Sequence, residues 1–380
     1  MTQATYSKGL EGVVAGESTI CLIEGKIGKL RYRGYSIEEL AARSDFEEVT
    51  YLLLYGELPD AAQMAAFSKR MRRCRELSPH VLDMVRNFPK DAHPMELLQS
   101  VVSYLSGYVK HRIHHSATCN CRDTLHQVVQ MASVTAAWYR FQEGKEYVPP
   151  RGDLSHGANF LYMLRGETPS EEEGRIFDSA LVMHAEHGFN ASTFTARVVA
   201  STMSTCYCSI SAAIGALYGT LHGGANEKVM AMVDAVGTKE NVEAWMMNAA
   251  ARGQKIMGMG HREYKVKDPR SYLMEQYLET LSKEKGDTRY YDILKEIERI
   301  FKERMEEKGK PVYPNVDFFS GAVYRMLGIP SILFTPIFAV ARVSGWLAHI
   351  LEQRTDNRLF RPESIYRGSE GRSYVPMSDR

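Results

Sequence analysis

The sequence has almost no excess of charge of either sign. Its 47 Lys and Arg residues are matched by 46 Asp and Glu residues, which leaves a formal net charge of +1. A near-neutral protein has no overall field that would draw it to nucleic acid or to a membrane surface. We therefore expect neither partner, and any site for an anion must be built locally.

Cysteine is also scarce, with six residues among 380. They show no pattern of a secreted protein stapled by disulfides. The N-terminal segment lacks the charged start and apolar run of a signal peptide. These absences predict reduced thiols and a cytoplasmic location.

Long apolar runs and strand signals are missing as well. The longest apolar stretch, near Ile329–Phe338, is interrupted by Pro330 and Pro336, and we expect no segment that crosses a bilayer. Only Ser18–Tyr35 has the alternation and turn residues of a β-hairpin. Because strands do not alternate with helices, a parallel-sheet domain is not expected. The sequence predicts an all-α protein with one short N-terminal β-hairpin.

Helical signals fill most of the remaining chain. Ser36 is followed by two glutamates in the pattern of an N-cap, and the apolar pattern of Phe46–Tyr55 stops at Gly56. Ala191–Tyr218 is predicted as one long helix, which should be buried because it is uncharged from Val198 onward. Further segments with helical spacing are Ala61–Cys74, Met95–Tyr108, Thr124–Tyr139, Glu171–His187, Tyr291–Lys308 and Phe338–Leu351.

The composition changes twice along the chain. After Asn226 the sequence becomes more charged, and near Pro330 it returns to apolar residues. This pattern predicts a smaller helical domain inserted into a larger one. We place the first part of the large domain at residues 1–223, the small domain at 224–329 and the return to the large domain at 330–380.

Three short segments concentrate glycine, histidine and charge. They are Thr220–Glu227, Gly258–Tyr264 with the following Lys267–Arg270, and Pro314–Gly321. Each segment alone also fits a structural role: a histidine at a helix boundary, a glycine turn that lacks the full dinucleotide pattern, or an N-cap. Their combination in one chain favours a catalytic site.

Two further features stand out beside these segments. The segment Glu186–Thr193 places a histidine and an asparagine at a helix boundary. Arg342 lies within an apolar helical stretch, and Arg361 directly precedes a proline. A buried arginine requires an anionic partner, either a carboxylate of the chain or a carboxylate of a ligand.

One cluster resembles a set of metal ligands. It consists of His111, His114, His115, Cys119 and Cys121. Its spacing fits no structural zinc pattern, and the side chains of Cys206 and Cys208 should diverge on a helix. We expect no metal site.

Taken together, the motifs resemble the three signature segments of the citrate synthase family, in that family's order. The segments that carry the resemblance are His222-Gly223-Gly224-Ala225-Asn226-Glu227, Gly260-His261 with Asp268-Pro269-Arg270, and Asn315-Val316-Asp317. Other segments resemble the short bacterial and archaeal members: Gly9–Ala15, Leu30–Tyr35, Tyr51–Pro59, Asp153–Tyr162 and Phe360–Pro362. The resemblance covers nearly the whole chain.

The resemblance implies a role for each site residue. Asp317 would be the catalytic base, His222 would donate a hydrogen bond to the forming enolate, and His261 would polarise the oxaloacetate carbonyl. The residues implied to bind substrate carboxylates are His187, Arg270, Arg342 and Arg361, with Arg75 as a further ligand contact. The loop implied to hold coenzyme A is formed by Lys255, Ile256, Met257, Gly258 and Met259.

The implied activity is that of citrate synthase, an acyltransferase that joins acetyl-CoA, oxaloacetate and water into citrate and CoA at the entry to the tricarboxylic acid cycle. The coenzyme A thioester would be a co-substrate, with no tightly bound cofactor. Arg361 would reach the neighbouring site of a homodimer, and each cleft would close around its substrates.

Three alternatives remain at this stage. A 2-methylcitrate synthase that uses propionyl-CoA would share all these residues, because one methylene changes selectivity only modestly. A non-catalytic binding protein would be marked by loss of His222, His261 or Asp317, and all three are present. A metal-dependent protein would use the His111–Cys121 segment.

Overall fold

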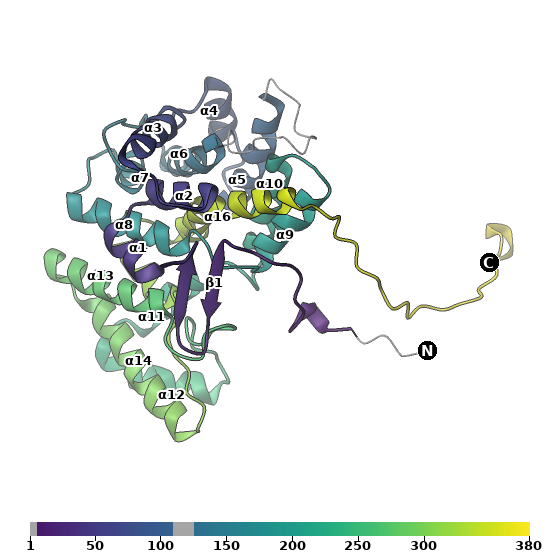
Figure 1. Ribbon diagram of the computed structural model, residues 1–380. Helices are drawn as coiled ribbons and strands as arrows, with labels where there is room; N and C mark the ends of the chain where they lie inside the picture. The colour runs from purple at the N-terminus through teal and green to yellow at the C-terminus, as the bar shows by residue number, and fades with distance from the viewer. Residues whose placement is uncertain (1–5, 109–124) are drawn as a thin grey trace.

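The computed structural model describes residues 6–108 and 125–380 of the chain. Helices dominate this part, and the one sheet in it is small (Figure 1). The predicted all-α class is confirmed.

The sheet contains the predicted hairpin. Strands β1 (Cys21–Glu24) and β2 (Lys29–Tyr32) pair antiparallel, with Cys21 opposite Tyr32. A third strand, β3 (Tyr35–Ser36), follows a tight turn in which Arg33 and Gly34 have φ of 48° and 93°. Left-handed values at both turn residues suit a two-residue hairpin. The sequence did not predict β3 because two residues carry no periodic pattern.

The larger group of helices comes from both ends of the chain (Figure 1). Its members are α1 (Ile37–Arg43), α2 (Phe46–Tyr55), α3 (Ala61–Arg73), α4 (Pro79–Arg86), α5 (Pro94–Leu105), α6 (Leu125–Gln142), α7 (His156–Arg165), α8 (Glu171–His184), α9 (Ala191–Ser201), α10 (Cys206–Tyr218) and α16 (Phe334–Thr355). Helix α16 packs against α2, α6, α8, α9 and α10, so the last helix completes the core that the first ten begin.

Local cap signals located several helix ends correctly. The Ser36 side chain accepts the Glu39 N–H at the start of α1. Helix α2 has the predicted bounds and ends at Gly56, whose φ is 93°. Caps are set by a few neighbouring residues, and for this reason the sequence reveals them.

The prediction of one long helix over Ala191–Tyr218 is wrong. The chain breaks into α9 and α10 at Met203, whose φ is 61°. Thr205 then caps α10 by accepting the Cys208 N–H. Serine and threonine side chains near the break compete for backbone groups, and apolar residues on both sides hide the break from the hydropathy pattern.

Helix α16 is longer than predicted. It begins at Phe334, so Pro336 lies in its first turn, where a missing N–H costs no helical hydrogen bond. The stretch 331–355 is long and apolar enough to cross a membrane, which corrects our expectation that no segment reaches that length. However, 83% of its most apolar part is buried inside the protein. We interpret it as a core helix, which passes the same length test.

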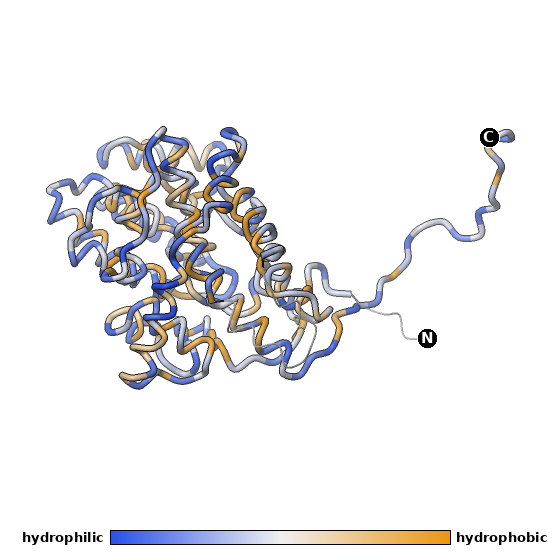
Figure 2. The backbone as a smooth tube through the Cα atoms, turned by 90° about the horizontal axis from the view of Figure 1, so that it is seen from above, coloured by the Kyte–Doolittle hydropathy of each residue, from blue (hydrophilic) through white to orange (hydrophobic). Residues whose placement is uncertain are grey.

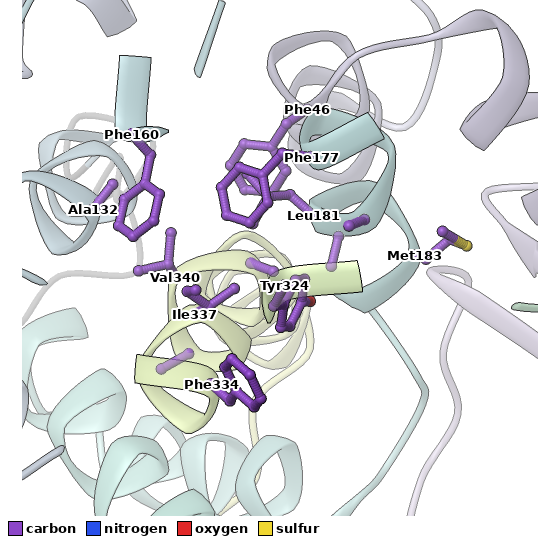
Figure 3. Close-up of a cluster of buried hydrophobic side chains, with 14 of the residues drawn as sticks. Phe46, Ala132, Phe160, Phe177, Leu181, Met183, Tyr324, Phe334, Ile337 and Val340 are labelled. Carbon is purple, nitrogen blue, oxygen red and sulfur yellow. The ribbon is translucent and has the colours of Figure 1, made fainter. Parts of the chain in front are cut away.

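Aromatic rings connect α16 to its neighbours in the core (Figure 3). Phe160 of α7 stacks on Phe177 of α8 with ring centres 5.3 Å apart, and Phe177 meets Tyr324 edge to face at 6.0 Å. Tyr324 in turn lies 5.4 Å from Phe334 of α16. Such pairs add to the stabilisation that comes from burial alone. The aromatic row fixes α16 firmly, and α16 carries Arg342.

The second group of helices lies at one end of the molecule (Figure 1). It contains α11 (Ala225–Val236), α12 (Val242–Ala251), α13 (Pro269–Lys285), α14 (Arg289–Glu307) and α15 (Asp317–Met326). Helices α11 and α13 pack on α15, and α12 packs on α14. The chain enters this group after α10 and leaves it after α15. The boundaries at 223/224 and 329/330 stay predictions.

The first and last described segments leave the helical body on the same side. The segment after α16 runs outward as an extended arm, and residues 6–20, which precede β1, run outward on the same side in both views (Figures 1 and 2). Apolar side chains such as Val14 and Tyr374 are exposed on these segments.

The cysteine and metal predictions have mixed outcomes. Cys21, Cys74 and Cys208 are free thiols, whereas Cys206 is disulfide-bonded, so the reduced state expected throughout does not hold at Cys206. The cluster in His111–Cys121 lies outside the described residues. Within residues 6–108 and 125–380, no group of three or more His, Cys, Asp or Glu residues is arranged to hold a metal ion.

Candidate active site

The segment that contains His187 meets the segment that contains His261, where the α8–α9 loop faces the loop before α13. The rings of His187 and His261 lie edge to face with centres 5.2 Å apart. His187 Nε2 lies 3.1 Å from the Tyr264 hydroxyl. Burial and the nearby Arg270 charge hold the pKa of His187 well below its usual range. His187 is therefore a neutral side chain at the meeting point of the two helix groups.

The segment with His261 is fastened to the segment with Asp317. Met259 and Pro314 form an antiparallel bridge. The Asn315 N–H donates to the Gly258 carbonyl at 2.9 Å, and the Asn315 side chain donates to the Gly260 carbonyl at 2.9 Å. Gly258 has a φ of 77°, and a Cβ there would lie 2.9 Å from Phe318 Cα, so only glycine permits this close approach.

Hydrogen bonds fix the tautomer of His261. Its Nδ1 accepts the backbone N–H groups of Glu263 at 3.0 Å and Tyr264 at 3.3 Å. In a neutral imidazole the proton must then sit on Nε2. Burial, followed by the Arg270 charge, lowers the pKa of His261 to about 4. At neutral pH His261 is therefore an uncharged donor through Nε2–H.

Hydrogen bonds fix the other tautomer at His222. Its Nε2 accepts the Ser192 backbone N–H at 3.2 Å and lies 2.9 Å from the Ser192 hydroxyl. The Trp346 indole N–H donates to the same hydroxyl at 3.2 Å. Burial, followed by the Arg342 charge, lowers the pKa of His222 to about 4. His222 therefore presents a neutral Nδ1–H.

Sequence reasoning missed Ser192 and Trp346. Ser192 lies in a segment that it singled out, two residues after the Asn190 that caps α9. No local pattern predicts its contact with His222, which is 30 residues away.

Asp317 is the first residue of α15 and has an elevated basicity. Its own N–H donates to the Asn315 side-chain oxygen at 3.0 Å. Burial raises the pKa of the Asp317 carboxyl to about 6, although the positive charge of Arg270 acts against this rise. Across the described part of the chain, no hydrogen bond or ion pair holds its carboxylate. A carboxylate that is ionised at neutral pH and lacks a partner can accept a proton from a substrate.

Arg270 is rigidly held by Asp268, a residue of the same motif for which the sequence predicts no role. Asp268 pairs with it in a two-pronged contact, Oδ1 to Nε at 3.0 Å and Oδ2 to Nη2 at 2.7 Å. Asp268 also accepts the Val316 N–H at 3.3 Å. The carboxylate therefore ties Arg270 to the start of α15, one residue before Asp317.

Arg342 is a buried charge with little compensation from the protein. Its Nε donates to the His184 carbonyl at 2.7 Å, and its guanidinium carbon lies 4.6 Å from the centre of the Phe338 ring. Among residues 6–108 and 125–380, no carboxylate forms an ion pair with it. Because a buried unpaired charge is costly, its other N–H groups suit a carboxylate supplied by a ligand.

Two predicted ligand contacts are not brought to this site by the single chain. Arg75 is buried and donates to Glu47 at 2.7 Å and to the carbonyl groups of Arg151 and Leu154. These contacts are with the protein itself and suit a structural role, and the predicted ligand contact of Arg75 stays a prediction. Arg361 is exposed on the arm beyond α16.

The predicted coenzyme A loop follows α12. Gly258 is buried and Lys255 is exposed, while Ile256, Met257 and Met259 are partly buried. Lys255 and Met257 border a cavity of about 440 Å³ whose other walls include Lys228, Trp245 and Arg252. Cations beside an apolar wall suit a ligand that carries both phosphate and an aromatic ring.

This fold and site define an enzyme that can take a proton from a weakly acidic carbon. Asp317 is suited to act as the base, the two neutral histidines can offer fixed N–H donors to developing negative charge, and Arg270 and Arg342 can provide positive charge for an anionic co-substrate. Comparison with known proteins names the family. The chain belongs to the citrate synthase family, because residues 9–363 match the family model described as "Citrate synthase, C-terminal domain".

Relatives and solved structures agree over the full length. The chain is 45% identical to the citrate synthase of Deinococcus radiodurans over 99% of this chain and 100% of that protein. It is 38% identical to the 2-methylcitrate synthase of Shewanella oneidensis over 98% and 97% of the two chains. The citrate synthase of Thermoplasma acidophilum, solved in a ternary complex with carboxymethyl coenzyme A and oxaloacetate, matches with a TM-score of 0.92, 32% identity and complete coverage of both chains.

Proposed function

We propose that this protein condenses acetyl-CoA with oxaloacetate and water to form citrate and CoA. The observation that carries the proposal is the pair of backbone-fixed neutral histidines, His222 and His261, whose pKa values, like that of Asp317, respond to the nearby charges of Arg270 or Arg342. This arrangement supplies one base and two separate N–H donors. A condensation between a thioester and a ketone needs these groups, because negative charge forms first on the thioester oxygen and then on the ketone oxygen.

In the first step Asp317 takes a proton from the acetyl methyl carbon. The electron pair of the broken C–H bond moves toward the thioester carbonyl, whose oxygen becomes an enolate oxygen. His222 donates its Nδ1–H to that oxygen, because its Nε2 is already used by Ser192. The elevated pKa of Asp317, about 6, narrows the mismatch with the weakly acidic carbon.

In the second step the enolate carbon attacks the oxaloacetate carbonyl carbon. His261 donates a hydrogen bond from its Nε2–H to the ketone oxygen. That oxygen takes the negative charge and then gains one proton, which balances the proton removed by Asp317, to become the hydroxyl of the product. Arg270, Arg342 and His187 hold the two substrate carboxylates. Water then cleaves the citryl thioester, which releases CoA and leaves the third carboxylate of citrate.

The acyl donor is the finer point of the proposal. We favour acetyl-CoA over propionyl-CoA. The test measures the rate of free-thiol release with each thioester in the presence of oxaloacetate. We expect the higher kcat/KM with acetyl-CoA. A strong preference for propionyl-CoA would instead identify a 2-methylcitrate synthase, and no thiol release with either donor would refute condensation itself.

We also propose a homodimer in which Arg361 completes the partner's site. The exposed position of Arg361 on an extended arm supports this idea. Co-expression of Arg361→Ala and Asp317→Ala chains should restore activity that neither variant shows alone. In a two-fold dimer, half the dimers are mixed and each has one intact site, so roughly a quarter of wild-type activity is expected. If Arg361 served its own chain, no mixed dimer would be active, and a fully active monomer in sedimentation would also contradict the proposal.

The β1–β2 turn supports His261 and offers a further prediction. The Lys265 N–H donates to the Gly25 carbonyl at 2.9 Å, and a Cβ at Gly25 would overlap the Glu263 carbonyl. Gly25→Val should displace the backbone that fixes His261 Nδ1, and it should lower kcat by about tenfold or more. Gly152→Val is the matched control, because a Cβ at Gly152 meets nothing within 4 Å. Equal kcat values in the two variants would contradict the prediction.

A further inference from the structure

A buried polar network lies directly behind His187. The Glu186 side chain is fully buried, and its Oε1 accepts two hydrogen bonds, from the Gly188 N–H at 2.6 Å and from His349 Nε2 at 2.9 Å. The two contacts therefore fix both chain neighbours of His187, the Glu186 carboxylate and the Gly188 backbone. The reaction steps proposed above do not use Glu186 or His349.

The direction of the hydrogen bonds is determined by Arg197. Its Nη1 lies 3.0 Å from His349 Nδ1, and a guanidinium can only donate. His349 Nδ1 is therefore an acceptor, which places the imidazole proton on Nε2 and makes His349 the donor to Glu186. The same Nη1 donates to Glu352 at 2.8 Å. The chain of contacts thus alternates strictly between donors and acceptors.

The network is anchored at its far end and packed tightly near the site. Glu352 accepts the Thr19 N–H at 2.8 Å, just before β1. The guanidinium of Arg197 lies over the Phe189 ring at 4.6 Å. Gly345 of α16 lets Glu186 approach, because a Cβ at Gly345 would overlap the second carboxylate oxygen of Glu186. An exposed ion pair would have neither this packing nor this set of partners.

The hydrogen bonds of this network hold one loop in place, residues 186–190 between α8 and α9. Gly188 has a φ of 60° and is pinned through its N–H by Glu186. His187 lies between them, and the only side-chain hydrogen bond that the described structure gives its ring is to Tyr264. The orientation of His187 therefore depends on the backbone around it.

We propose that Glu186 and His349 are positioning residues that hold His187 for recognition of oxaloacetate. This inference rests on the proposed function, in which His187 binds a substrate carboxylate. His349 and Glu186 act through the backbone of the loop and do not touch the reacting atoms. Loss of the His349 donor frees one side of Glu186, so the Gly188 turn and the His187 ring lose their fixed arrangement. The acyl-CoA side of the site is held by a different residue, Ser192 in the first turn of α9, which fixes His222 and joins the loop through Asn190.

The test compares three variants with the wild-type protein. His349→Phe keeps the ring volume but removes both hydrogen bonds. His349→Gln restores a donor at the position of Nε2. His156→Phe is the matched control, because His156 is also a buried histidine but neither of its ring nitrogens has a hydrogen-bond partner in the described structure. Steady-state kinetics would give KM for oxaloacetate and for acetyl-CoA, and thermal unfolding would report stability.

We expect His349→Phe to raise the KM for oxaloacetate by about tenfold, which corresponds to the loss of one hydrogen bond to a charged group. The KM for acetyl-CoA should change by less than about twofold in the same variant, because we expect the substitution to weaken the binding of oxaloacetate and not of both substrates. His349→Gln should recover most of the lost affinity. His156→Phe should leave both KM values at the wild-type level.

An unchanged KM for oxaloacetate in folded His349→Phe would overturn the inference. Parallel rises in both KM values, without recovery in His349→Gln, would also overturn it, because they would indicate a merely structural role. If His349→Phe fails to fold, Glu186→Gln is measured in its place with the same expected split. A wild-type protein that releases no thiol would instead refute the proposed function, and calorimetric titration with oxaloacetate would still compare the variants.

Discussion

Asp317→Ala should lower kcat by about 10²- to 10⁴-fold, the range expected when a general base is removed. The mutation deletes a carboxylate for which the described residues provide no partner, whereas Asp268 is fully engaged by Arg270 and Val316. Oxaloacetate binding should persist, because the cations and His187 remain. Single-turnover thiol release and calorimetric titration with oxaloacetate would measure the two effects separately.

Asp153→Ala is a suitable control for this variant. Asp153 is exposed and pairs with Arg151, which is not one of the proposed catalytic or substrate-binding residues. The control should keep wild-type kcat and KM. Near-wild-type turnover in Asp317→Ala would refute the assignment of the base, and loss of oxaloacetate binding would show that Asp317 organises the site instead.

The same carboxylate predicts the acid limb of the pH profile. Burial raises the pKa of Asp317 to about 6, so its basic form is lost as the pH falls through that value. The wild-type kcat should therefore decline below about pH 6. His222 and His261 have pKa values of about 4, so both stay neutral donors over that decline. A decline centred near pH 4 would assign the limb to the histidines instead.

The sequence predicts features that depend on close neighbours. The cap at Ser36 and the end of α2 before Gly56 follow from residues within one or two turns. The break between α9 and α10 was missed because hydropathy does not change across it. The sequence does not predict the first turn of α16 because proline usually interrupts a helix, although a helix accepts it in the first turn.

The site also depends on contacts between residues that are far apart in the sequence, which local patterns do not predict. The resemblance to a family supplied the identities of His222, His261 and Asp317, but their protonation depends on contacts that sequence spacing does not reveal. Ser192 fixes one tautomer from 30 residues away, and the turn after His261 fixes the other. The contact of Arg75 with Glu47, which lies 28 residues earlier in the chain, is likewise hidden from sequence spacing.

Arg342→Leu should raise the KM for oxaloacetate by about 100-fold or more, the effect of removing one partner of a buried charged pair. Arg342 forms no ion pair within the described residues, and its one backbone acceptor leaves most of its donors for a ligand. The leucine side chain is compatible with the apolar surroundings of α16. We therefore expect little loss of stability, and thermal unfolding would check this point alongside the kinetics.

Arg354→Leu, on the same helix, separates this effect from general damage. Arg354 is also buried, but it donates to the Ser204 carbonyl at the start of α10. This control should lower stability while the KM for oxaloacetate stays close to the wild-type value. Equal KM changes in both variants would argue against a ligand role for Arg342.

Arg342→Lys then divides charge from geometry. Lysine keeps the positive charge but lacks the planar fork that matches a carboxylate. If two parallel hydrogen bonds hold the substrate, the KM should rise by about tenfold, an intermediate value. Recovery of wild-type KM would show that charge alone is recognised. A KM as high as that of Arg342→Leu would show that the fork is essential, because a charge without it would then give no binding advantage.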